Sequence, residues 1–235
     1  GEGEGEGEGA GEGEGEGEGE GEGEGEGAYV PSQDVYVHPT LGSDVSGNGT
    51  SGNPWRTIMK AVATVTGSSE FPVTIHLLPG LYQEQVTMDP WERLEGPDPD
   101  NPALATIQHN GIFVVRAADN VRFRALRIES TRFVGDCTLL DSTYAAPESV
   151  EHVHFDGNFN NSAYAMAIIQ TGTAIPLIRH CRFSNLGYGM LALHTQARIA
   201  FCVFNQIRFD GLVRPPQTKE KDRKSTRLNS SHVSQ

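Results

Sequence analysis

Short stretches in which apolar and polar residues alternate recur along the middle of the chain. They include residues 73–77, 121–123, 153–155 and 199–201, and Asn, Gly and Asp residues separate them. Alternation with a period of two is typical of β-strands that have one buried face. Residues 54–65 differ, because their apolar side chains recur at helical spacing. The pattern therefore predicts an all-β protein with one early helix.

Similar segments recur at short intervals in the second half of the chain. Three alignments show this: 178–183 with 199–204 at an offset of 21, 159–166 with 183–190 at an offset of 24, and 126–128 with 157–159 at an offset of 31, the last with an excursion within 133–147. Repeats of this length are typical of the turns of a solenoid.

Strands this short cannot bury an apolar face within one repeat. Stacked as coils ~4.8 Å apart, they form parallel sheets in which equivalent side chains lie above one another. We therefore expect Cys181 and Cys202 to be neighbours in one interior column, and Phe183 and Phe204 in the next. The thiols are expected to pack as small apolar side chains, with a redox or metal role as the alternative.

The two ends of the chain differ in composition from the middle. Residues 1–27 alternate Gly and Glu, interrupted once at Ala10, so we expect 1–28 to be a low-complexity disordered tail, with a functional polyanion as the alternative. Residues 222–232 resemble the translation of a sequencing adapter, so 218–235 is expected to be a disordered, artefactual tail. The folded domain should then span 34–217, and we expect a fragment that is truncated at its C-terminal end.

Charge and cysteine spacing exclude several classes of protein. The formal net charge is −13, but 12 of the 31 acidic residues lie in 1–27, so the expected domain is nearly neutral. A nearly neutral domain gives no support to nucleic-acid binding, and no apolar run reaches the ~18 residues of a membrane helix. The three cysteines lack the CxxC spacing of a zinc site.

Two segments carry a resemblance to known families. "VTIHLLPGLYQEQVTM" followed by "RLEG", with its turn Gly80-Leu81-Tyr82-Gln83-Glu84, resembles the opening coils of the pectin-lyase-like right-handed parallel β-helix superfamily. Residues 37–62 are similar to the N-terminal segment of β-helix proteins grouped under a domain of unknown function, in which a helix caps the solenoid. The resemblance implies a right-handed parallel β-helix with an N-terminal capping helix, located outside the cell or at its surface.

The same resemblance implies a polysaccharide partner without fixing a reaction. The Asp-Phe-Ile-Phe-Gly segment of pectin methylesterases and the Gly-His-Gly segment of polygalacturonases are absent from the chain. We therefore expect a protein that recognises or processes polysaccharides, acidic sugar polymers among them, and that would be a lyase or a glycoside hydrolase if it is an enzyme. The alternative is a noncatalytic surface, adhesive or structural solenoid module.

Strand geometry predicts a charged cluster on the outer surface. With Val153 and Phe155 inside, His152, His154 and Asp156 point outward together. Alignment with residues 121–123 would place Arg122 beside His154 and Arg124 beside Asp156, and the next coil would bring Arg179 or His180 to Asp156. A carboxylate between arginines, with a histidine nearby, suits acidic-sugar binding or proton transfer; a salt-bridge ladder is the alternative. The catalytic candidates are Arg124, His154, Asp156, Arg179 and His180.

Further candidates concern substrate and metal binding. The expected substrate-binding residues are Arg122, Arg124, Arg182 and the pair Tyr164 and Tyr188, which should stack one coil apart and offer a sugar platform, or pack in the core or a turn. Asp44, Ser46 and Asn48 alternate oxygen ligands as calcium loops do, although Trp55 stands where such a loop has its last acidic ligand. A plain turn is the alternative, and no other cofactor is indicated.

Overall fold

The chain is described by a computed structural model for residues 1, 33–168, 175–192, 197–209 and 211–213. The expected tail 1–28, apart from Gly1, and the expected tail 218–235 lie outside these residues. The expected domain is described as far as Val213. No helix in this part of the chain combines the length and apolar character that a membrane crossing requires.

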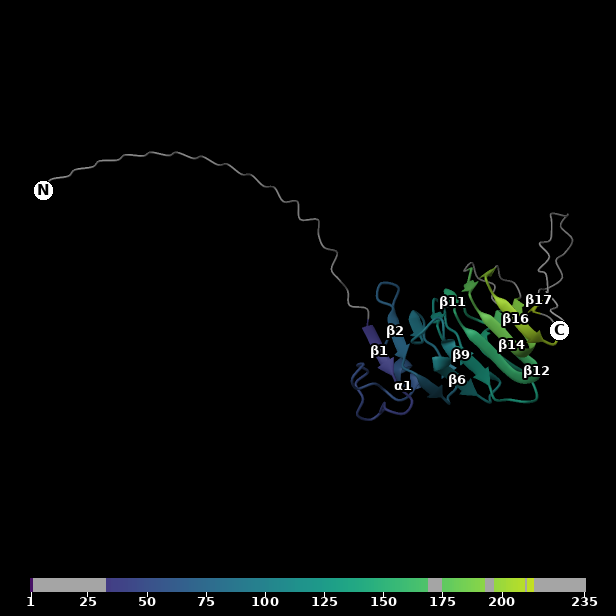
Figure 1. Cartoon of the computed structure of the whole chain (residues 1–235), viewed down its shortest axis with the longest axis horizontal. Helices are drawn as coiled ribbons and strands as arrows, with labels where there is room; N and C mark the ends of the chain where they lie inside the picture. Colours follow the sequence, from purple (N-terminus) through teal and green to yellow (C-terminus); the bar gives the residue numbers. More distant parts are fainter. Residues whose placement is uncertain (2–32, 169–174, 193–196, 210, 214–235) are drawn as a thin grey trace. The chain divides into compact units, whose positions relative to one another are not determined.

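Seven strands, one from each pass of the chain, form a parallel sheet (Figure 1). In spatial order they are β1 (Gln33–Val37), β2 (Val73–Leu77), β5 (Glu92–Glu95), β8 (Arg122–Arg124), β11 (Ser149–Glu151), β13 (Leu177–Arg179) and β15 (Arg198–Ala200). The spatial order follows the order of the strands in the sequence, as it must when each coil stacks on the one before it.

The remaining strands form a ten-stranded sheet with two arms. The first arm holds β3 (Gly80–Tyr82), β6 (Ala105–His109), β9 (Arg127–Ser130), the beginnings of β12 (His154–Ile168) and β14 (Arg182–Ala192), and β16 (Val203–Ile207). The second arm holds β4 (Val86–Thr87), β7 (Phe113–Arg116), β10 (Cys137–Ser142), the ends of β12 and β14, and β17 (Leu212–Val213). Strands β12 and β14 run through both arms, with register shifts between Asp156 and Tyr164.

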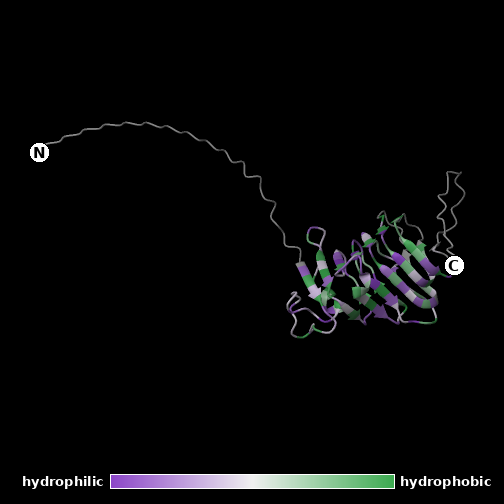
Figure 2. Ribbon diagram, viewed as in Figure 1, coloured by the Kyte–Doolittle hydropathy of each residue, from purple (hydrophilic) through white to green (hydrophobic). Residues whose placement is uncertain are grey.

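Every pairing between these strands is parallel. Each coil therefore crosses the seven-stranded sheet once and then passes through the two arms. The prediction of an all-β, right-handed parallel β-helix is confirmed. Figure 2 shows apolar and polar residues alternating along the strands, which places one face of each sheet in the core.

Equivalent side chains form the expected interior columns. The rings of Phe155 and Phe183 stack with centroids 5.1 Å apart, and those of Phe183 and Phe204 stack 4.6 Å apart. Arg182 pairs with Val203, so the predicted offset of 21 is confirmed. The offset of 24 holds for Tyr164 with Tyr188 but is wrong for Phe159 with Phe183, because Phe183 pairs with Phe155. The offset of 31 is wrong, since Ile128 pairs with Phe155 at an offset of 27.

Helix α1 (Ile58–Val62) packs against the first coil and is shorter than the predicted 54–65. Its face of Ile58, Ala61 and Val62 is buried, as the helical spacing predicts. Trp55 is buried but not helical, because its backbone bridges to Val37 of β1. A 3-10 turn, η1 (Pro102–Leu104), leads into β6.

In four successive coils a single left-handed residue turns the chain from the seven-stranded sheet into the first arm. Ala125, His152, His180 and Phe201 hold this corner in successive coils, with φ values of 58°, 53°, 53° and 54°. One left-handed residue reverses the inward and outward alternation over a very short distance. The corner therefore decides which side chains of the following strand face outward.

Candidate functional site

The structure separates three of the predicted arginines from Asp156. Arg122 pairs with Ser149, Arg124 with Glu151, and Glu151 with Arg179, all on the seven-stranded sheet. The predicted neighbours of His154 and Asp156 are therefore wrong, because the alignment placed β8 over the start of β12 instead of over β11.

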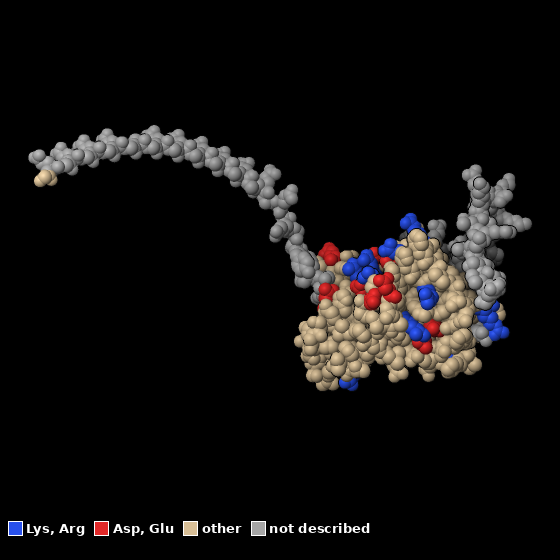
Figure 3. Space-filling model, in the orientation of Figure 1, with Lys and Arg blue, Asp and Glu red and all other residues tan. Residues whose placement is uncertain are grey.

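On that sheet the three arginines form the cross-strand ion-pair ladder that was the alternative. Arg124 pairs with Glu95, and Arg122 pairs with Glu148. Arg179 Nη2 lies 2.6 Å from Glu151 Oε2. Figure 3 shows positive and negative side chains intermixed on one face of the molecule. Paired and partly exposed charges of this kind contribute little to stability, and each of these arginines already has an acidic partner.

His180 lies at the corner between the sheets rather than beside Asp156. Its ring stacks on His152, with centroids 4.8 Å apart, and on Phe201, with centroids 5.1 Å apart. Phe201 is 78% exposed. The corner is thus an aromatic ridge on which His180 has both ring faces covered.

His154 and Asp156 do share the outer face of the first arm, as predicted. Phe155 between them is buried in the core, so the two flanking side chains point the other way. The residues beside them on adjacent coils are Arg127 and Glu129 from β9, and Arg182, Ser184 and Asn185 from β14. We call Arg127, Glu129, His154, Asp156, Ser184 and Asn185 the Asp156 cluster.

Asp156 accepts three hydrogen bonds, and it is only 7% exposed. Its Oδ2 accepts a hydrogen bond from Arg127 Nη2 at 2.8 Å. Its Oδ1 accepts from the backbone N–H of Asn158 at 2.9 Å and from Asn185 Nδ2 at 3.0 Å. Arg127 Nη2 also lies 3.0 Å from Glu129 Oε2. One guanidinium nitrogen therefore links two carboxylates from successive coils.

His154 supplies the titratable group of the cluster. Burial and the nearby charge of Arg127 lower the pKa of His154, while Asp156 opposes this shift. The imidazole is therefore neutral near pH 7 and can accept a proton. Its Nε2 lies 2.7 Å from the hydroxyl of Ser184, and that hydroxyl also lies 3.3 Å from the carbonyl oxygen of Phe155.

Two polar atoms in the cluster have no hydrogen-bond partner in the described part of the chain. They are Arg127 Nε, a donor, and Asn185 Oδ1, an acceptor, and both are buried. Buried polar atoms are nearly always hydrogen-bonded, to protein or to water. The cluster therefore has unused hydrogen-bonding capacity of both kinds next to a neutral proton acceptor.

Arg182 lies beside the cluster in the column of Arg127 and His154. Arg182 is exposed, and it forms no ion pair with the rest of the described chain. Of the predicted substrate-binding arginines, only Arg182 is exposed, has no ion-pair partner in the described chain and lies next to His154.

The two predicted tyrosines stack on the second arm. Tyr164 and Tyr188 have ring centroids 4.6 Å apart at 8°, and Phe209 continues the stack at 5.0 Å. They line a shallow surface pocket of about 340 Å³ with Asp136, Ser162 and Arg208. Because the rings cover one another face to face, they offer mainly edges and hydroxyl groups to a ligand in this pocket, not the flat platform that sugar stacking needs.

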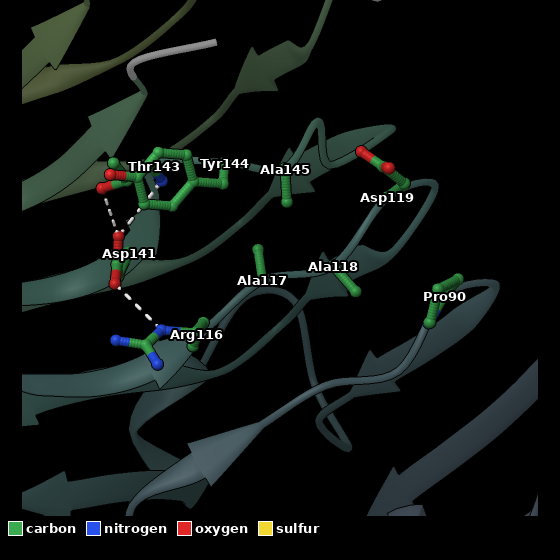
Figure 4. A pocket seen from close by; sticks show the side chains of 9 residues that line it. All are labelled: Pro90, Arg116, Ala117, Ala118, Asp119, Asp141, Thr143, Tyr144 and Ala145. Atoms are coloured by element: carbon green, nitrogen blue, oxygen red, sulfur yellow. Dashed lines mark hydrogen bonds and ion pairs between the residues drawn. The ribbon is translucent and has the colours of Figure 1, made fainter.

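A second surface pocket, of about 270 Å³, lies where the second arm turns toward the seven-stranded sheet (Figure 4). Arg116 Nε lies 3.1 Å from Asp141 Oδ2. Asp141 Oδ1 accepts hydrogen bonds from the backbone N–H of Thr143 at 3.1 Å and from its hydroxyl at 2.5 Å. The guanidinium also lies 4.0 Å above the ring of Phe113. The charged and polar groups of this pocket thus bind one another: Asp141 binds both Arg116 and Thr143.

The loop with the predicted calcium ligands uses its oxygens internally. Asp44 Oδ1 accepts from the backbone N–H groups of Arg56 and Thr57 at 2.8 and 3.0 Å, and Oδ2 accepts from the Thr57 hydroxyl at 2.8 Å. Ser46 donates to Ser43, and Asn48 accepts from Thr50. Across the described residues, no group of three or more His, Cys, Asp or Glu side chains could hold a metal ion. Calcium binding here stays a prediction, and the loop holds the start of α1.

Sequence reasoning missed four members of the Asp156 cluster. Arg127 and Glu129 belong to the Leu126-Arg127-Ile128-Glu129 segment, whose alternation is as clear as that of 121–123. Ser184 and Asn185 follow Phe183, which was already aligned with Phe204. The correct offset of 27 would have placed Arg127 beside His154 and Glu129 beside Asp156.

The cluster thus lies on the outer surface of a parallel β-helix. The chain is similar to solved structures of two pectin methylesterases. Pectin methylesterase PemA from Erwinia chrysanthemi shares 14% identity, over 70% of this chain and 54% of that one, with a TM-score of 0.44. The penultimately deglycosylated pectin methylesterase from Aspergillus niger shares 13%, over 87% of this chain and 93% of that one, with a TM-score of 0.35. The present chain therefore spans about half the length of PemA. No family model and no curated protein matches the sequence.

Proposed function

We propose that the chain is an extracellular protein that recognises an acidic polysaccharide on the outer face of the first arm. The observation that carries the proposal is the Asp156 cluster with Arg182 beside it, spread over three successive coils. Coils lie ~4.8 Å apart, so a linear polymer along the stacking direction meets polar side chains from one coil after another. A compact ligand would leave most of these groups unused.

Each group has a role that follows from its chemistry. Arg182 is the exposed cation without an ion-pair partner in the described chain, so it binds the sugar carboxylate. Glu129 retains acceptor capacity for sugar hydroxyl groups. Asp156 holds Arg127 and Asn185 in place, because both of its oxygens are already occupied.

The decisive comparison is between Arg182→Ala and Arg179→Ala. Both changes remove one exposed arginine from the same coil, but Arg179 lies on the other sheet and is paired with Glu151. Binding of polygalacturonate and alginate, with and without calcium, is measured by calorimetry against a neutral polymer. Loss of one charged hydrogen bond, about 1.5 to 3 kcal/mol, should weaken acidic-polymer binding by about tenfold or more in Arg182→Ala.

Arg179→Ala should bind within about twofold of the unchanged protein. Equal weakening by both substitutions would show that only net charge matters, and the proposed site would be wrong. Equal binding of neutral and acidic polymers would exclude the role given to Arg182.

Recognition of the polymer does not require catalysis, and one observation favours a noncatalytic binding module over a processing enzyme. Asp156 accepts three hydrogen bonds from protein groups, so it is poorly placed to exchange a proton with a substrate. His154 is then the proton acceptor that processing would require. Unsaturated products or new reducing ends that disappear in His154→Ala would identify a processing enzyme. Intact polymer with unchanged binding would identify a binding module.

A further inference from the structure

Cys181 and Cys202 occupy the same position in two successive coils. Arg179 pairs with Ala200 just before them, and Arg182 pairs with Val203 just after them. The backbone N–H of Val203 donates to the carbonyl oxygen of Cys181 at 2.9 Å. The two backbones are therefore held at the spacing of neighbouring strands, ~4.8 Å, which lies within the Cα separations that disulfides span.

The two side chains also share one orientation. Cys181 Sγ lies 3.3 Å from the carbonyl oxygen of Arg179, and Cys202 Sγ lies 3.4 Å from that of Ala200, two residues before each cysteine. Cys202 Sγ also lies 3.8 Å from the carbonyl oxygen of Ile178, in the coil that holds Cys181. Cys181 Sγ likewise lies 3.4 Å from the carbonyl oxygen of Val150 in the coil before it, so the two thiols keep one orientation along the stack.

The thiols differ in acidity and exposure. The neighbouring Cys181 thiol lowers the pKa of Cys202 to about 7, although burial opposes the shift. Burial raises the pKa of Cys181, which is 1% exposed. Cys202 is only partly buried. Cys202 is therefore the thiol that reacts first with an external disulfide, and Cys181 is the buried thiol beside it.

We propose that Cys181 and Cys202 form a disulfide that joins their two coils when the protein meets a small-molecule disulfide oxidant such as oxidised glutathione. The Cys202 thiolate attacks one glutathione sulfur, forms a mixed disulfide and releases the other glutathione as a thiol. The Cys181 sulfur then attacks Cys202 Sγ, and the second glutathione leaves. One external disulfide is reduced, two protein thiols are oxidised, and their two protons end on the released glutathione thiols.

Cys137 provides an internal control. It is buried in β10, and its neighbour on β12 is Ala163, so no thiol stands beside it in that pairing. The disulfide would close a loop of one coil that contains β14 and β15. Its formation does not depend on the proposed polysaccharide function, because none of the Asp156 cluster takes part.

The test uses the whole chain, incubated with oxidised or reduced glutathione, then denatured, alkylated and analysed by peptide mass spectrometry. After oxidation, Cys137 alone should be alkylated, and a peptide pair linking 181 to 202 should appear. The thermal midpoint should rise by several degrees and fall again with dithiothreitol. Cys137→Ser should behave as the unchanged protein, whereas Cys202→Ser should keep its remaining thiols alkylatable.

Three results would each overturn the proposal. The first is that all three cysteines remain alkylatable at oxidant concentrations that oxidise small dithiols. The second is a link that includes Cys137. The third is a disulfide only between two chains through Cys202.

Discussion

Glu92 is a carboxyl group in an apolar interior. It lies at the start of β5 and is fully buried. Its Oε2 accepts a hydrogen bond from the backbone N–H of Asp89 at 2.9 Å, while its Oε1 has no partner in the described part of the chain. Burial raises the pKa of Glu92 from 4.5 to about 7. The folded state therefore retains a proton that the unfolded state loses at a lower pH.

This proton couples stability to pH. Below pH 4.5 both states bind it, and between 4.5 and about 7 only the folded state does. The free energy of unfolding should fall as pH rises through this window and change little above it. Glu92→Gln, which carries no titratable group, should lack this dependence and be more stable at pH 8 by about 1 to 3 kcal/mol. Urea unfolding between pH 4.5 and 8.5 measures both curves.

Glu95→Gln is the matched control, since Glu95 is on the same strand but on the outer face, paired with Arg124. The control should retain the slope of the unchanged protein. If Glu92→Gln retained that slope as well, the buried carboxyl would not be the source of the pH dependence.

Single corner residues also explain what the sequence did not reveal about the site. One coil, for example, holds two apolar-polar-apolar segments, Val121 to Phe123 and Leu126 to Ile128, separated by Arg124 and the left-handed Ala125. The two segments look alike in sequence, so Phe155 was aligned with Phe123 although it pairs with Ile128. His154 and Asp156 were still placed outward correctly, because alternation within a strand does not depend on which neighbour it has.

At the scale of elements, helix α1 depends on other parts of the chain. Five residues are too few for a helix to be stable alone. The Glu84 carboxylate accepts hydrogen bonds from the backbone N–H groups of Ile58 and Met59, at 2.8 and 3.1 Å. Tyr82, two residues earlier, donates to the carbonyl oxygens of Val37 and Leu78. The Gly-x-Tyr-x-Glu turn therefore ties the cap to the first coil.

Removal of the Glu84 carboxylate should loosen this cap. Glu84→Ala leaves two backbone N–H groups at the start of the helix without acceptors, and should lower the free energy of unfolding by about 1 to 3 kcal/mol. Glu84→Gln should cost less, because the amide oxygen still accepts one hydrogen bond. Chemical unfolding followed by circular dichroism measures both, with the exposed Gln83→Ala as control. Equal losses at 83 and 84 would contradict the capping role.

The sequence predicted the helix and its buried face but overestimated its length. Apolar spacing cannot distinguish a helical residue from a buried one next to a helix, and Trp55 is of the second kind. Thr57 caps the helix locally, because its hydroxyl accepts from the backbone N–H of Lys60. Asp44 and Glu84 also fix the start of the helix, with side chains 13 or more residues away from it. Contacts this distant in sequence leave no local pattern to read.

At the scale of the whole domain, each coil contacts mainly the coils before and after it. The stability of such an array is close to a sum of terms from neighbouring pairs. Phe183 is fully buried between Phe155 and Phe204, whereas Phe204 is only partly buried. Phenylalanines in the same column should therefore contribute different amounts to the stability of the domain, depending on their position in the stack.

This inequality is measurable. Phe183→Ala should lower the free energy of unfolding by about 3 to 5 kcal/mol, because it opens a cavity between two stacked rings. Phe204→Ala should cost less than half as much and should mainly speed amide hydrogen exchange in β15 and β16. Urea unfolding and exchange mass spectrometry give the two readouts. A larger loss for Phe204→Ala would mean that the last described coil supports the others, contrary to the stacking argument.

The parallel pairing of the strands has a mechanical consequence. In all fifteen strand pairings, the hydrogen bonds that join one coil to the next point along the stacking direction. Tension between the first and last coils would load these bonds one row at a time, so the domain would peel under a small force. Tension across the coils would load many rows in shear and meet far greater resistance.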